Sequence, residues 1–278
     1  MNAYADLRSI RSVWMFSLLV VGLGAGLTAQ PARADDPKAR KIMEQVRDRD
    51  DGATASSDME MVLIDKRGNQ RVRAVRTYRR KEGKDKHSIM FFLSPADVKG
   101  TGFLTYDYDQ EKKDDDQWLY LPALKKTKRI ASGDKSGSFM GSDMNYSDMT
   151  TPNLNDFDYT LVKEEDVDGQ KTWRIEAVPR NETVMDETGY SKRVIWVRQD
   201  NFMVIRSVGY IYKSEDMKFM QVVKLEKIDG VWAPVEMHVA TKRGADTLHQ
   251  TILRFTNIHH NKPLPAEMFT QRKLEKGL

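Results

Sequence analysis

Residue types that could perform chemistry occur in three places, and none has the spacing of a catalytic or metal-binding motif. Residues 133–136 (Gly-Asp-Lys-Ser) resemble the end of a phosphate-binding loop, but the glycine spacing and the strand-loop-helix context are missing. The acids at 107–116 lack the glycine and the terminal glutamate of a calcium-binding loop, which favours a solvated hairpin tip. His259 and His260 are adjacent and would point to opposite faces of a strand, which disfavours a shared metal ion.

The sequence therefore predicts no catalytic residue, no metal site and no cofactor, and we expect a protein that is not an enzyme. Neither Gly-x-Ser-x-Gly nor His-Glu-x-x-His occurs, so no nucleophile or general base can be identified. The paired carboxylates of a hydrolase leave no recognisable spacing in a sequence. A hydrolase therefore stays as an alternative.

Residues 1–34 have the pattern of an export signal. Two arginines precede an apolar run at 13–29, and the triplet 32–34 (Ala-Arg-Ala) forms an Ala-x-Ala cleavage site. A membrane-spanning helix is the alternative, but three glycines within the run and the cleavage triplet favour removal. We therefore predict a cleavable signal peptide at 1–34, a single domain at 35–278 and a location in the periplasm.

Composition narrows the function further. The chain has no cysteine, which excludes thiol catalysis, thiolate zinc sites and lipid attachment through an N-terminal cysteine, so we do not expect a lipoprotein. Residues 1–34 hold three of the 45 basic residues and one of the 41 acidic residues, so the mature chain is nearly neutral. We expect no nucleic-acid partner. Basic clusters such as 125–129 are interpreted as solvated faces, with transient contact to a membrane surface as the alternative.

The periodicity of the chain predicts one helix followed by many strands. Apolar residues at 39, 42, 43 and 46 have helical spacing, and Gly52 ends that helix. Alternation and turn residues then predict strands at 58–66, 70–80, 87–93, 102–108, 117–121, 158–163, 171–178, 190–198, 202–213, 218–228, 231–241 and 247–258.

Short turns predict that neighbouring strands are antiparallel. Asp168-Gly169, Asp200-Asn201 and Asp229-Gly230 are two-residue hairpin signals. A single sheet of eleven to twelve strands has to curl, so we predict a mainly β (α+β) fold, an incomplete antiparallel barrel with a few helices as plug or lid. A two-sheet sandwich is the structural alternative. The apolar face, expected to point inward, is represented by Tyr210, Tyr212, Phe219, Val223 and Leu225.

The segment 131–155 differs from both of its flanks. It is rich in glycine, serine, aspartate and asparagine, yet it contains two aromatic residues and three methionines at 139–149. Long loops in compact domains are usually functional lids or disordered, and the apolar content disfavours disorder. Methionine suits a site that must accept varied chains. A lid over a binding site and a simple cap on the core are both compatible with this pattern.

Three stretches carry a family resemblance. Residues 94–104, 116–130 and 139–148, followed by a closing segment at 264–269, are similar in type and order to the outer-membrane lipoprotein-sorting protein family, the LolA-like group. This resemblance implies an incomplete β-barrel over helices that encloses an apolar cavity for acyl chains. It also implies partnership with an inner-membrane exporter of the resistance-nodulation-division (RND) type.

We therefore predict a periplasmic carrier or chaperone that binds lipid or lipoprotein acyl chains in a hydrophobic cavity, for transfer to or from the outer membrane. A sensor or exporter accessory protein without cargo is the alternative from another class. The predicted cavity and lid residues are Phe103, Trp118, Tyr120, Phe139, Met140, Met144, Tyr146 and Met149.

Overall fold

The computed structural model describes residues 35–110 and 113–278, and the predicted signal peptide at 1–34 lies outside this part of the chain. The described residues form three α-helices, α1 (Pro37–Asp48), α2 (Glu182–Thr188) and α3 (Gln271–Lys276). Six short 3-10 turns accompany them: η1 (Pro122–Leu124), η2 (Ser132–Asp134), η3 (Phe139–Gly141), η4 (Tyr146–Met149), η5 (Leu154–Asp156) and η6 (Ala266–Phe269).

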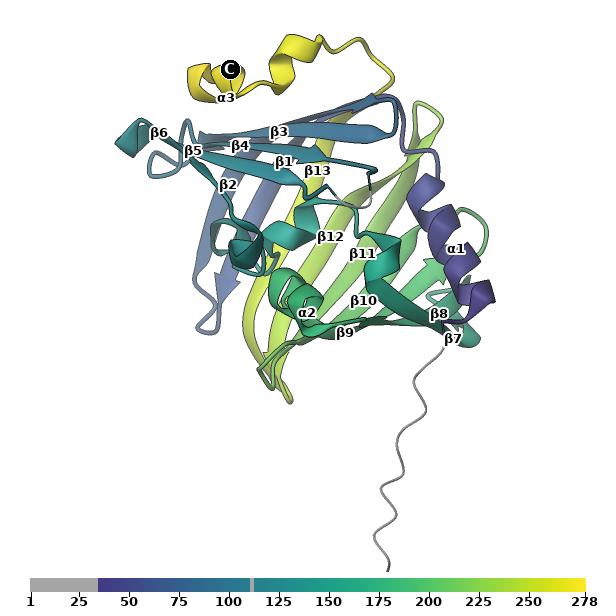
Figure 1. Ribbon diagram of the computed structural model, residues 1–278. Helices are drawn as coiled ribbons and strands as arrows, with labels where there is room; N and C mark the ends of the chain where they lie inside the picture. The colour runs from purple at the N-terminus through teal and green to yellow at the C-terminus, as the bar shows by residue number, and fades with distance from the viewer. Residues whose placement is uncertain (1–34, 111–112) are drawn as a thin grey trace, which may run out of the picture. The chain divides into compact units, whose positions relative to one another are not determined.

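Thirteen strands form one antiparallel sheet, which is curled and unclosed (Figure 1). They are β1 (Thr54–Asp65), β2 (Gln70–Glu82), β3 (Asp85–Ser94), β4 (Gly102–Asp107), β5 (Asp116–Leu121), β6 (Lys126–Arg129), β7 (Phe157–Val167), β8 (Gln170–Pro179), β9 (Tyr190–Arg198), β10 (Val204–Ile211), β11 (Met217–Ile228), β12 (Val231–Arg243) and β13 (Asp246–His260). The order across the sheet is β6-β5-β4-β3-β2-β1-β13-β12-β11-β10-β9-β8-β7. The predicted open barrel is confirmed, and the sandwich is excluded.

Helix α1 forms where the sequence predicts a helix. The Asp36 side chain caps its start by accepting hydrogen bonds from the backbone N–H groups of Lys38 and Ala39, and Pro37 occupies the first turn. The buried side chains of α1 pack against Phe157, Tyr159 and other residues on the inner face of β7, β8 and β9. The helix thus covers the concave face at the β7 end of the sheet.

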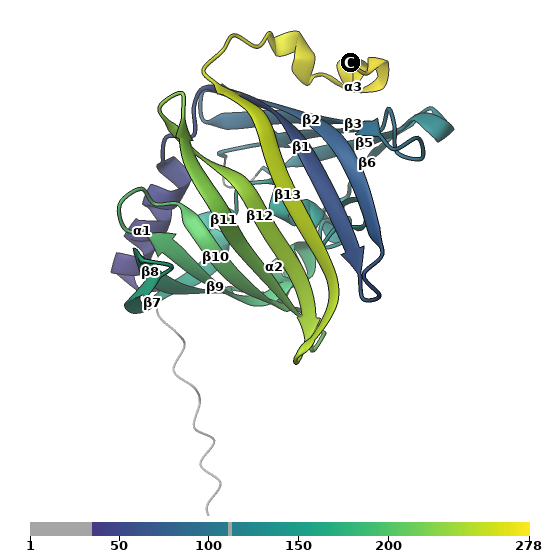
Figure 2. The ribbon, with the colours of Figure 1, turned by 180° about the vertical axis from the view of Figure 1, so that it is seen from behind.

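The C-terminal segment covers the outer face of the opposite half. Phe269 and Leu274 are buried against Ile89, Phe91 and Leu104 of β3 and β4. Gly102 permits this contact because a Cβ atom there would lie 2.6 Å from the Cδ1 atom of Leu274. Figure 1 shows α3 on one side of β3, β4 and β5, and Figure 2 shows β11, β12 and β13 from behind without a covering helix.

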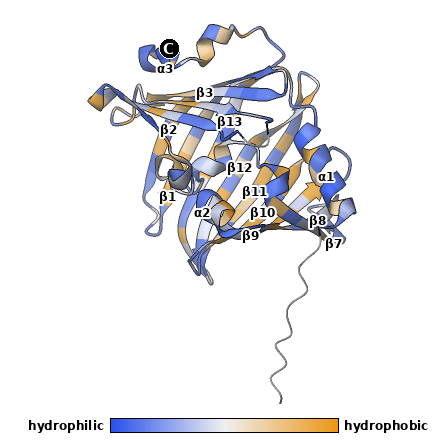
Figure 3. Ribbon diagram, in the orientation of Figure 1, coloured by the Kyte–Doolittle hydropathy of each residue, from blue (hydrophilic) through white to orange (hydrophobic). Residues whose placement is uncertain are grey.

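Hydropathy alternates along many strands, as Figure 3 shows, but the predicted inward face is wrong in part. Tyr210 and Val223 are exposed, 36% and 50% respectively. The register of β11 against β12 shifts between Val222 and Lys224, so a simple alternation through Val223 fails. In the residues that the structure describes, none of the helices combines the length and apolar character needed to span a membrane.

Candidate functional site

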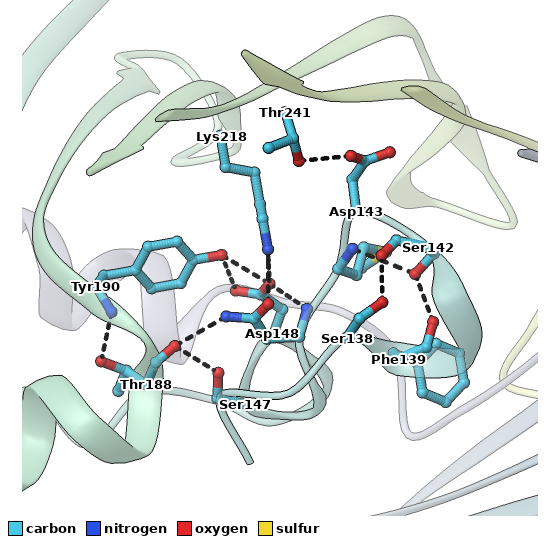
Figure 4. A network of polar contacts seen from close by, with 12 residues as sticks. Ser138, Phe139, Ser142, Asp143, Ser147, Asp148, Thr188, Tyr190, Lys218 and Thr241 are labelled. Carbon is cyan, nitrogen blue, oxygen red and sulfur yellow. Dashed lines mark hydrogen bonds and ion pairs between the residues drawn. The ribbon is translucent and has the colours of Figure 1, made fainter. Parts of the chain in front are cut away.

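The segment 138–149, here called the lid segment, lies against the concave face of the sheet (Figure 4). Turns η3 and η4 fold it into a compact shape. Asn145 and Asp148 form a capping box at η4, in which the Asp148 carboxylate accepts a hydrogen bond of 2.8 Å from the backbone N–H of Asn145. Met140 has a φ of 51°, in the left-handed region, and its carbonyl oxygen accepts a hydrogen bond from Arg73. Local hydrogen bonds therefore fix the shape of the lid segment.

Aromatic side chains attach the lid segment to the inner surface. Phe139 is 1% exposed, and its ring centroid lies 4.9 Å from that of Phe103 on β4 and 5.6 Å from that of Tyr146. The structure brings together six of the eight predicted residues in one apolar cluster with β1, β2 and β3, namely Phe103, Phe139, Met140, Met144, Tyr146 and Met149. We call the sheet side chains of this cluster, namely Phe103, Met59, Met61, Phe92 and Leu119, the inner apolar cluster.

The other two predicted residues do not lie in this cluster. Trp118 and Tyr120 pack on the outer face of β5, in the cluster that contains Phe269 and Leu274. Leu119, between them, points to the lid segment. Successive side chains of a strand alternate between faces, so the two aromatic residues cannot share the surface of Leu119.

A buried carboxylate joins the lid segment to β12 and β13. The Asp143 side chain is 1% exposed and accepts hydrogen bonds from Thr241 at 2.6 Å and from Thr251 at 2.7 Å. His249 Nδ1 lies 2.7 Å from the same carboxylate, and the backbone N–H of Asp143 donates to Thr251 Oγ1 at 2.9 Å. Four contacts from one residue hold the lid segment to the middle of the sheet.

A second polar group joins the lid segment to β9 and β11. Tyr190 OH donates to Asp148 at 2.9 Å, and Lys218 Nζ donates to Asn145 Oδ1 at 2.7 Å and lies 3.8 Å from Asp148. Burial lowers the pKa of Lys218, with Asp148 opposing that shift. The network in Figure 4 therefore joins the lid segment to the sheet through the ion pair of Asp148 with Lys218 and through hydrogen bonds from neutral side chains such as Tyr190 and Thr241.

A cavity of about 1010 Å³ opens beside the lid segment, between α1, α2 and residues 107–110 and 113–115. Asp148, Tyr190 and Arg193 are among its lining residues, and most of its other lining side chains are polar or charged. The expected hollow with apolar walls is therefore not this cavity. The apolar inner surface is instead covered by α1 and by the lid segment.

Four carboxyl groups that line the cavity have raised pKa values, those of Asp107, Asp115, Asp156 and Glu187. Burial and the nearby Asp107 raise the pKa of Asp115 to about 6, although the Tyr108 backbone N–H donates to Asp115 at 2.9 Å. Burial likewise raises the pKa of Asp107, which accepts hydrogen bonds from Thr151. Within residues 35–110 and 113–278, no three His, Asp or Glu side chains are grouped to hold a metal ion.

Asp115→Asn is expected to stabilise the protein by about 1 kcal/mol at about pH 7.5 and to have little effect at about pH 4. A carboxyl whose folded pKa exceeds its unfolded value contributes stability that is present at low pH and lost as the pH rises through about 6. Urea unfolding at both pH values measures the difference. The exposed neighbour Asp114→Asn is the control, and an equal gain at both pH values would contradict the assignment.

The curled open sheet with helices and a lid segment on its concave face defines a LolA-like fold. It is similar to a LolA superfamily protein from Nitrosomonas europaea, with a TM-score of 0.63 and 17% identity over 84% of this chain and 98% of that one. It is also similar to a candidate outer membrane lipoprotein-sorting protein domain from Vibrio parahaemolyticus, with a TM-score of 0.76 and 28% identity over 86% of this chain and 98% of that one.

A third relative, with a higher sequence identity than the two above, shows the family of this chain. A DUF1329 family protein from Desulfovibrio piger ATCC 29098 is 30% identical over 87% of this chain and 99% of that one, with a TM-score of 0.78. A family model described as "uncharacterized protein" matches residues 84–276. No curated protein matches the sequence. The chain belongs to the DUF1329 family of LolA-like proteins.

Proposed function

We propose that this protein is a periplasmic carrier that takes up lipid or lipoprotein acyl chains under the lid segment and passes them to or from the outer membrane. The observation that carries this proposal is the construction of the lid segment. Its apolar side chains rest on the apolar inner surface, whereas separable polar contacts attach it to the sheet. Such a segment can move away and leave an apolar surface for cargo.

Acyl binding under the lid segment requires no catalytic group. Burial of each CH₂ group is worth about 0.8 kcal/mol, so a chain that replaces the lid side chains on the inner apolar cluster gains a comparable free energy. Exchange between lid and cargo keeps binding reversible. The lipoprotein-sorting description of the relative from Vibrio parahaemolyticus supports this class of cargo. Cleavage of residues 1–34 and transfer of cargo to an RND-type exporter belong to the same proposal.

A second candidate function is supported by the filled interior. Phe139 is almost fully buried on the sheet, as expected for a sensor or exporter accessory protein whose lid segment never opens. Mass spectrometry of an organic extract of the purified protein separates the two candidates. A carrier releases stoichiometric lipid, whereas an accessory protein without cargo releases none and still captures its exporter.

Met140→Asp is expected to weaken binding of a fluorescent fatty acyl probe by about tenfold without unfolding the protein. Met140 packs on the inner apolar cluster, so a carboxylate there would have to lose water when a chain is bound. A fluorescence titration measures the dissociation constant, and circular dichroism checks the fold. Val223→Asp, on an exposed position of β11, is the matched control. Unchanged binding would remove the lid segment from the carrier model.

A further inference from the structure

The inner faces of β3 and β4 change character along their length. On β4 the inward side chains are Phe103, then Thr105, then Asp107, and on β3 Met90, Ser88 and Lys86 lie directly opposite them. The inward side of both strands therefore passes from apolar to neutral polar to charged. Lys86 and Asp107 also line the polar cavity, so the apolar cluster leads into the cavity through a neutral polar zone.

Strand β5 continues this gradient. Leu119 is paired with Phe103 and belongs to the inner apolar cluster, and Gln117 is paired with Thr105. Gln117 is 0% exposed and Thr105 is 1% exposed, although both carry polar side chains. Besides Ser88, the neutral polar zone thus contains the hydroxyl of Thr105 and the amide of Gln117, which lie side by side beneath the lid segment.

Both groups have unused hydrogen-bonding capacity. The Thr105 Oγ1 and Gln117 Oε1 atoms have no hydrogen-bond partner among the described residues. Gln117 Nε2 donates to the carbonyl oxygen of Tyr146 in the lid segment at 2.9 Å. A buried polar atom without a partner costs about 1–3 kcal/mol, so a ligand that supplies partners for both atoms regains that free energy.

The chemistry of the two atoms selects one kind of ligand group. Gln117 Oε1 can only accept a hydrogen bond, and the Thr105 hydroxyl can donate one. A secondary amide offers both complements, because its N–H donates and its carbonyl oxygen accepts. An ester of the same shape has the carbonyl oxygen but no N–H group, so it leaves Gln117 Oε1 without a partner.

We infer that Thr105 and Gln117 form a binding site for the amide group of an N-acylated amphiphile. This inference rests on the proposed function and specifies its ligand. The acyl chain lies on the inner apolar cluster, the amide lies between Thr105 and Gln117, and the polar head enters the cavity beside Lys86 and Asp107. The lid segment must withdraw Tyr146 from Gln117 for the amide to bind.

The test compares N-palmitoylethanolamine with 2-hydroxyethyl palmitate, which differ only by N–H in place of an ester oxygen. The wild-type protein is expected to bind the amide about tenfold more tightly by competition with a fluorescent acyl probe. Equal affinities would overturn this inference and leave the carrier proposal standing. If neither compound bound, both proposals would fail.

Variants assign the preference to the two residues. Gln117→Leu removes the acceptor and Thr105→Val removes the donor, so each is expected to reduce the amide preference to less than about threefold while ester binding persists. Gln221→Leu, an exposed position on β11, is the matched control and should keep the full preference. Retention of the full preference in both Gln117→Leu and Thr105→Val would place the amide elsewhere. The use of two variants guards against misfolding of either one.

Discussion

Asp143→Ala is expected to lower the free energy of unfolding by about 3 kcal/mol and to release the lid segment from the sheet. The carboxylate of Asp143 accepts hydrogen bonds from Thr241 and Thr251 and lies beside His249, almost completely shielded from water. Alanine would leave these side chains facing the lid segment without an acceptor. Urea unfolding measures the stability, and hydrogen exchange of peptides covering 138–149 measures the release.

The location of the increased hydrogen exchange shows whether Asp143 anchors the lid segment or only stabilises the whole fold. If Asp143 anchors the lid segment, exchange within 138–149 should increase far more than exchange within β7 and β8, which do not contact this carboxylate. Asp246→Ala, at the exposed start of β13, is the control. It should change the free energy of unfolding by no more than about 0.5 kcal/mol and leave exchange within 138–149 unchanged. A uniform rise in exchange throughout the sheet would show that Asp143 serves only global stability.

The fold could be predicted from local signals because hairpin turns dictate the neighbours of each strand. Asp168 and Gly169 both have positive φ, as do Asp229 and Gly230, and each pair joins strands that are antiparallel in the structure. The third predicted turn, Asp200-Asn201, also joins antiparallel strands, but it lies in a longer connection at 199–203 between β9 and β10. The pattern of the sequence does not predict strand β6. Its sequence, Lys-Thr-Lys-Arg at 126–129, has no apolar alternation because β6 is an edge strand held by backbone pairing to β5.

The apolar residues of the candidate site could be predicted from the sequence, whereas its buried acids could not. Aromatic and methionine residues in a polar loop are a clear signal, and six of the predicted residues do converge. Asp143 and Asp148 lie in the same loop, but acids in loops usually face solvent, and their partners on the sheet are far along the chain. Each of the two acids is preceded by a serine and followed by a methionine, and this repeated Ser-Asp-Met pattern is the signal that could have identified them.

The prediction that Trp118 and Tyr120 line the inner surface is wrong because the sequence of β5 does not reveal which of its faces points inward. Alternation on β5 placed these two residues on one face and Leu119 on the other, but both faces of β5 are covered. The outer cover comes from α3, which lies about 150 residues further along the chain. Hydropathy along one strand cannot decide which of two buried faces points to the lid segment.

Asp148→Ala is expected to destabilise the protein by about 3–5 kcal/mol, and Lys218→Met in the same chain should recover at least about half of that loss. The Lys218 side chain is 10% exposed and the Asp148 side chain 13%, so removal of the acid leaves a cation in a poorly solvated place. Methionine has a similar length and no charge, and it removes that cost. Urea unfolding of the two single variants and the double variant gives the coupling free energy.

The same cycle tests whether this pair holds the lid segment. Asp148 also accepts a hydrogen bond from Tyr190, and this contact is absent in both chains that carry Asp148→Ala. The double variant should therefore recover stability while exchange within 138–149 stays faster than in the wild-type protein. Lys192→Met, on the outer face of β9, is the control that removes a lysine without affecting the lid segment. Additive losses in the double variant would mean that Asp148 and Lys218 act independently, and this pair would then not be one of the contacts that hold the lid segment to the sheet.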